Sequence, residues 1–225
     1  MAIALFLLIA EGLILWQGQR RLFWLTVEAT RSHWLAYLLA APGTILHESS
    51  HFIACLVLRV PAGGAVGERV RFFAPKRNEE DGSVVLGYVP HAKTDPLRGA
   101  LIAIAPILLV PPLLVGISML LLGDQIIKDP STAISDAAPW RVLLWVYFSL
   151  SCGQAAFPSP GDHIGIIGGV MLVLLAVALA SLFAHSKTGL EEPLMTAVII
   201  LAPAAIGALL AGIIFYPLAQ RRRRK

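Results

Sequence analysis

Long apolar stretches alternate with short polar connections along most of the chain. Six such segments are bounded by charged residues, proline or glycine: 1–17, 34–60, 97–122, 141–157, 162–184 and 193–217. A membrane-spanning helix needs roughly 20 mostly apolar residues. The pattern therefore predicts an all-α polytopic membrane protein with about six transmembrane helices. The first segment lacks a basic start and a small-residue cleavage site, so we expect an uncleaved span.

A different pattern separates the second and third apolar segments. Residues 69–73 and 83–89 are β-prone, and they flank a polar turn, 78–82, that contains Asp81-Gly82. Asp-Gly between two such runs is typical of a hairpin turn. We therefore expect a β-hairpin within 66–90. No repeat or linker divides the chain, which favours a single integral membrane domain, 1–225, with its core at 34–184.

Composition agrees with a lipid environment. Hydrophobic residues make up 57% of the chain and charged residues 14%, and the mean hydropathy is +0.75, outside the usual range of soluble domains. Nucleic-acid binding is disfavoured because no basic surface with interleaved aromatic residues is evident. Cys55 and Cys152 both lie in apolar segments, so no disulfide framework is implied.

The placement of basic residues predicts an orientation. The tail 221–225 consists of five basic residues and the connection 59–98 holds seven, whereas 18–33, 123–141 and 185–192 hold three, two and one. Because basic residues are enriched in cytoplasmic connections, both termini are predicted to be cytoplasmic. The tail would then contact anionic lipid.

One apolar segment contains His47-Glu48-Ser49-Ser50-His51. In a helix, the i, i+4 spacing places both imidazoles on one face, where they can bind one Zn²⁺ while Glu48 reaches the water that the metal activates. Each ionisable group in mid-membrane costs roughly 2.5 to 3.5 kcal/mol, and a divalent cation would offset that cost. The alternative is a structural role, in helix contacts or a water-filled cavity.

A catalytic zinc site usually has a third protein ligand. Asp162 is the best candidate, because it follows a break, Pro158-Ser159-Pro160-Gly161, between two apolar segments. The segment 141–157 would rise only about 25 Å as a helix, so it should end within the membrane, at a depth that His51 can match. Alternatively, Asp162 caps the next helix, or His163 is the ligand.

These motifs, in this order, resemble the site-2 protease group of intramembrane zinc metalloproteases. The resemblance covers roughly 34–184: His-Glu-Ser-Ser-His in one span, a hairpin next, and an Asp in a Pro-rich break two spans later. The sequence departs from the usual Asn-Pro-Asp-Gly or Leu-Asp-Gly pattern around that aspartate. The resemblance implies cleavage of membrane-embedded or membrane-proximal segments of protein substrates, with one zinc ion and Glu48 as the general base.

Three further features are weaker candidates. An exposed edge of the hairpin at Val84-Val85-Leu86 could hold an extended substrate by β-augmentation. His91 could donate to an oxyanion, or it could be a plain interfacial histidine. Gln154 could orient substrate or bond another helix.

Two rival functions follow from the same motif. A membrane zincin with a glutamate third ligand, acting on other peptide substrates, would have to use Glu191 or Glu192. A non-catalytic scaffold or transporter would keep the metal or polar cavity without hydrolysis.

Overall fold

The chain folds mostly into helices. A computed structural model describes residues 7, 10, 11, 14, 22–63, 68–77, 84–156, 213 and 216. The predicted segments 162–184 and 193–217, with the tail 221–225, lie almost wholly outside them, as does most of 1–17. The connection 18–33, predicted to be a loop, is helical over 22–30, because its apolar residues support a short buried face that includes Leu22 and Ala29.

Three long helices match three of the predicted segments closely. They are α2 (His33–Val57), α3 (Pro96–Leu122) and α6 (Pro139–Ala155). Ser32 caps the start of α2, and Asp95 caps α3, whose first residue is a proline. Proline suits that position because its missing N–H would have no partner there anyway.

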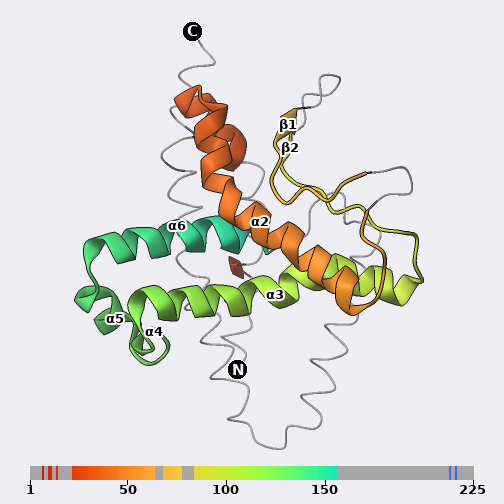
Figure 1. Cartoon of the computed structure of the whole chain (residues 1–225). Helices are drawn as coiled ribbons and strands as arrows, with labels where there is room; N and C mark the ends of the chain where they lie inside the picture. The colour runs from red at the N-terminus through yellow and green to blue at the C-terminus, as the bar shows by residue number, and fades with distance from the viewer. Residues whose placement is uncertain are drawn as a thin grey trace, which may run out of the picture.

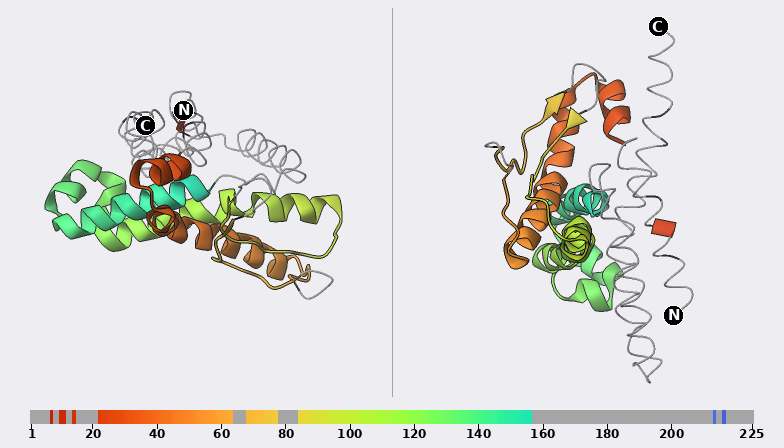
Figure 2. Two further views of the ribbon diagram at one scale, coloured as in Figure 1. Left: turned by 90° about the horizontal axis from the view of Figure 1, so that it is seen from above. Right: turned by 90° about the vertical axis from the view of Figure 1, so that its right-hand side faces the viewer.

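The helices α3 and α6 run alongside each other, and α2 crosses them (Figures 1 and 2). Each of the three packs against the other two. One buried cluster joins Val110 and Leu114 of α3 to Cys152 of α6, with Leu46 of α2 packed against it. The site residues of α2 therefore face two neighbouring helices.

Two short helices connect α3 to α6. They are α4 (Gln125–Lys128) and α5 (Pro130–Asp136), in the stretch that the hydropathy pattern left as a connection. Asp129 caps α5 by accepting from the Thr132 N–H at 3.2 Å. Ile126 and Ala133 pack with Trp145 of α6, so this connection closes one end of the bundle.

Two antiparallel strands lie between α2 and α3, where a hairpin was predicted, and its predicted turn, 78–82, lies outside the described residues. β1 (Lys76–Arg77) pairs antiparallel with β2 (Val84–Val85), and Arg71 and Tyr88 form a further bridge. The paired residues of the first strand, Lys76–Arg77, come later in the chain than the predicted 69–73. Arg71 pairs with Tyr88 and Lys76 pairs with Val85, so the first strand advances by five residues where the second advances by three. Two extra residues therefore bulge out of the first strand.

Within the described ranges, α3 alone is both long and apolar enough to cross a bilayer. The expectation of six spans is therefore not supported by these helices. α2 carries polar residues at its centre, and α6 has 17 residues, fewer than the roughly 20 that a span needs.

Candidate metal centre

The two histidines of the motif converge on one point. His47 and His51 lie one turn apart on α2, with 5% and 6% of their surface exposed. Their ring centroids are 4.7 Å apart with the planes nearly perpendicular, and their Nε2 atoms are 3.1 Å apart. The predicted juxtaposition of the two rings is therefore present.

The other ring nitrogens are held by backbone carbonyls of neighbouring helices. His47 Nδ1 lies 2.6 Å from the carbonyl oxygen of Ala155 in α6, and His51 Nδ1 lies 2.8 Å from that of Ile102 in α3. A carbonyl can only accept, so both Nδ1 atoms carry the proton. In this tautomer Nε2 is the ring nitrogen that carries the lone pair, and the two Nε2 atoms face each other at 3.1 Å.

This arrangement fits a metal ion. Two lone pairs at 3.1 Å repel each other unless a proton or a cation lies between them. Two nitrogens bound to tetrahedral zinc at about 2.0 to 2.1 Å would be roughly 3.3 Å apart, close to the observed separation. Nδ1–H bonds to carbonyls are the usual support for metal-binding histidines.

The histidine pair by itself would be an incomplete zinc site, because catalytic zinc usually has three protein ligands. They contain no group of three or more His, Cys, Asp or Glu side chains placed to share a metal ion. Asp162 and His163, the predicted third-ligand candidates, lie outside the described residues, as do Glu191 and Glu192.

Glu48 lies beneath the hairpin. Its side chain is partly buried, and a Cβ placed on Gly87 would come within 2.6 Å of Glu48 Cγ and 2.8 Å of the Phe72 carbonyl oxygen. The ring of Phe72 also packs edge-on against Phe52 of α2 at 5.5 Å. Residue 87 must therefore be glycine for the strand to pass this close. A glycine within a β-prone run was the sequence signal for such an approach.

A second glycine sets the contact between α2 and α6. A Cβ on Gly43 would collide with the Ser151 carbonyl oxygen and lie 2.8 Å from Ala155 Cβ. The Gly43 N–H donates to Ser151 Oγ at 2.9 Å. This close crossing brings the Ala155 carbonyl to His47. Small residues at helix crossings are common in membrane proteins, and the sequence prediction missed this one.

The weaker candidates lie on α6, on β2 and beyond the hairpin. His91 is exposed, and its Nδ1 bonds the adjacent Ala92 carbonyl at 3.0 Å. No interaction within the described part of the chain joins His91 to His47 or His51, so the oxyanion role has no support here. Gln154 lies in the last turn of α6, and its side chain is outside the described atoms. Val84 and Val85 form β2, and Leu86 follows them.

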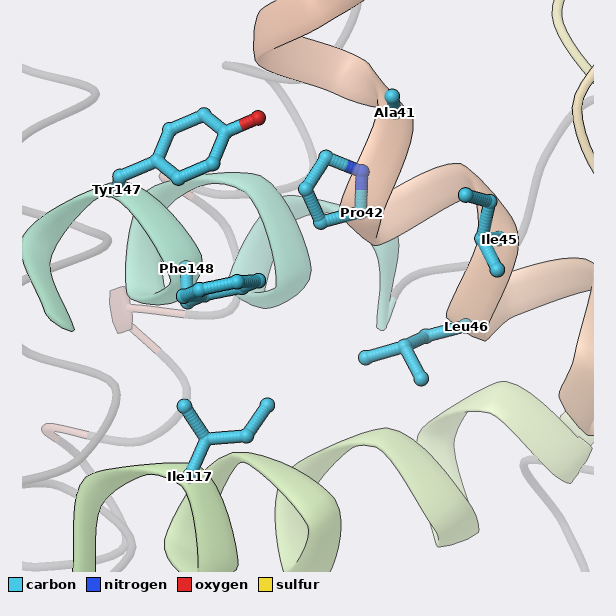
Figure 3. A pocket seen from close by; sticks show the side chains of 7 residues that line it. All are labelled: Ala41, Pro42, Ile45, Leu46, Ile117, Tyr147 and Phe148. Carbon is cyan, nitrogen blue, oxygen red and sulfur yellow. The ribbon is translucent and has the colours of Figure 1, made fainter. Parts of the chain in front are cut away.

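An open hollow of about 400 Å³ lies between α2, α3 and α6 (Figure 3). Its lining is almost wholly apolar, and Leu46, the neighbour of His47, is part of it. Among the described residues, no histidine or carboxylate lines this hollow, so it is distinct from the candidate metal centre. Its lining residues are Ala41, Pro42, Ile45, Leu46, Ile117, Tyr147 and Phe148.

Comparison of the chain with protein-family models, with curated proteins and with solved structures found no match. The histidine pair and its surroundings are therefore the features of this chain that bear on its function.

Proposed function

We propose that this chain is an intramembrane zinc metalloprotease of the site-2 protease type. The observation that carries the proposal is the pair of buried imidazoles, with Nε2 atoms 3.1 Å apart and both Nδ1 atoms bonded to carbonyls. A histidine pair built only for packing would not need two fixed tautomers that aim both lone pairs at one point. The next residue after His47 is a carboxylate, as hydrolysis requires.

The residues divide the chemistry among them. His47 and His51 would hold zinc through Nε2, with Asp162 as the proposed third ligand. When bound, zinc would polarise a water molecule and the scissile carbonyl. Glu48 takes a proton from the attacking water and later delivers it to the leaving amine nitrogen. The hairpin contact at Gly87 limits where the Glu48 side chain can lie.

The hairpin offers a place for an extended substrate. Tyr88 uses both its N–H and its carbonyl to bond Arg71, and the Leu86 carbonyl accepts from Ala74 N–H. Alternate residues of a strand point to opposite edges, so Gly87 and Val85 direct their backbone groups away from the first strand. A substrate strand added at that edge would run beside Glu48. β-Augmentation would unwind a helical substrate and expose its amide bonds.

The exterior of the bundle favours lipid as its surroundings. Large apolar side chains on all three long helices face outward, and Val57, Leu120 and Leu143 are 74%, 81% and 71% exposed. Such surfaces are rare on soluble monomers. We propose an integral membrane protein with the six predicted spans and both termini in the cytoplasm, acting on membrane-embedded or membrane-proximal segments of other proteins.

Glu48→Gln tests the proposal. The purified full-length protein is reconstituted with a library of single-span peptides, and cleavage is followed by mass spectrometry alongside bound zinc. The variant should lose about 10²- to 10⁴-fold in rate, the usual contribution of a general base, and should keep its zinc. Unchanged cleavage, or solute flux without cleavage in the wild type, would refute the protease assignment.

A further inference from the structure

A proline lies one helical turn beyond the carbonyl that holds His51. Pro106 is in the interior of α3 and is fully buried. In an α-helix the carbonyl of residue i accepts from the N–H of residue i+4. Proline has no N–H, so Pro106 leaves the Ile102 carbonyl without its normal partner within the helix.

That carbonyl is the acceptor for His51 Nδ1. Ile102 is 2% exposed, so water does not reach it readily, and His51 Nδ1 lies 2.8 Å away. A buried carbonyl without a partner costs roughly 1 to 3 kcal/mol. The histidine and the carbonyl therefore satisfy each other, with no competing N–H from residue 106.

The same arrangement occurs a second time in the bundle. Pro42 lies within α2, and the residue four positions before it is Leu38. The Leu38 carbonyl accepts from the hydroxyl of Tyr147 in α6 at 2.6 Å. A proline thus leaves a carbonyl open to a side chain of another helix at both positions.

We infer that Pro106 is a positioning residue for the metal ligand His51. By withholding an N–H, it reserves the Ile102 carbonyl for His51 Nδ1, which fixes the ring orientation and the tautomer that presents Nε2. This inference rests on the proposed metal function of the histidine pair and adds a residue that lies outside the His-Glu-x-x-His motif.

Pro106→Ala restores an N–H that competes for the Ile102 carbonyl. Zinc affinity of the full-length protein, measured with zinc alone against a competing chelator, should fall about 10- to 100-fold, the usual loss when such a supporting contact is removed. Pro112→Ala is the matched control, because Pro112 is exposed on the same helix. Leu108 lies four residues before Pro112, and within the described part of the chain no side chain donates to its carbonyl. The zinc affinity of Pro112→Ala should therefore be unchanged.

A second variant at residue 106 distinguishes the effect of the added N–H from the effect of the lost ring volume. Pro106→lactate gives an ester with the alanine side chain but without the N–H. We expect it to bind zinc like the wild type while Pro106→Ala does not. Equal loss in both variants would mean that volume, and not the N–H, matters, and would overturn the inference.

A second readout does not need zinc. ¹⁵N NMR of the histidine rings in zinc-free protein should show Nδ1–H for His51 in the wild type and in the ester, and a shift toward Nε2–H in Pro106→Ala. An unchanged His51 tautomer in Pro106→Ala would refute the role of Pro106. A wild type that binds no zinc would instead refute the metal centre, with the tautomer measurement still deciding the role of Pro106.

Discussion

Gly43→Ala should weaken the proposed zinc binding, although Gly43 is not one of the proposed metal ligands. The added methyl would collide with the Ser151 carbonyl oxygen and lie 2.7 Å from the Ser151 carbonyl carbon and 2.8 Å from Ala155 Cβ. Carbon atoms in ordinary contact are about 3.5 to 4.0 Å apart. Two of these obstacles are backbone atoms, so α6 must move away by roughly 1 Å to reach that separation.

The displacement would break the support of His47. Its Nδ1 lies 2.6 Å from the Ala155 carbonyl oxygen, and a shift of about 1 Å would carry that contact beyond hydrogen-bond range. The carbonyl would also lose a partner at the end of α6, where helical carbonyls have none of their own. We expect a loss of about 10- to 100-fold in zinc affinity, and about 1 to 3 kcal/mol of stability from overpacking.

The assay is competitive zinc titration of the full-length protein in detergent, with thermal unfolding measured in parallel. Gly116→Ala is the control, because a Cβ at Gly116 meets no described atom within 4 Å. It should leave zinc affinity unchanged and should not lower stability. Wild-type zinc affinity in Gly43→Ala would refute the reasoning that this crossing positions His47.

Three more predictions concern the hairpin and a helix cap. Gly87→Ala should displace Glu48 and lower kcat while bound zinc stays constant. Gly99→Ala is the control, because residue 99 has room for a Cβ, and its kcat should match that of the wild type. Equal kcat values in the two variants would contradict the contact between Gly87 and Glu48. Val85→Pro removes an N–H from the outer edge of β2 and should slow cleavage relative to Val85→Ala, and equal rates would exclude strand addition there. Hydrogen bonds from Ser131 and Thr132 lower the pKa of Asp129 to about 2 from 3.8. Because the pKa of Asp129 is lower in the folded state than in the unfolded state, the cap stabilises α5 above pH about 4, and this stabilisation is lost as the pH falls toward 2. Hydrogen exchange at the Thr132 amide should therefore become faster over this pH range in the wild type but not in Asp129→Asn.

Hydropathy was sufficient to place the three long helices. The segments 34–60, 97–122 and 141–157 became His33–Val57, Pro96–Leu122 and Pro139–Ala155, since their apolar residues require burial or lipid. It missed α5, although Asp129 followed by Pro130 is a readable start signal for a helix. The described helices do not support the predicted number of spans, because α2 holds polar residues at its centre and α6 has 17 residues.

The histidine pair could be predicted because side-chain type and spacing define it. The atoms that support it could not. The acceptors for His47 and His51 are backbone carbonyls 108 and 51 residues away along the chain, and every residue has a carbonyl. Gly43 and Gly87 were missed for a related reason, since the need for glycine arises only when another element comes close.

Zinc analysis of the purified full-length protein tests the central claim most directly, in the wild type and in Asp162→Ala, Glu191→Ala and Glu192→Ala. We expect about one zinc ion per chain, as in a catalytic site with three protein ligands, with loss of zinc in Asp162→Ala alone. If a glutamate variant lost its zinc while Asp162→Ala retained it, the third ligand would be a glutamate near the start of the last apolar segment. A wild-type protein that cleaves peptides without zinc would contradict the metal centre itself.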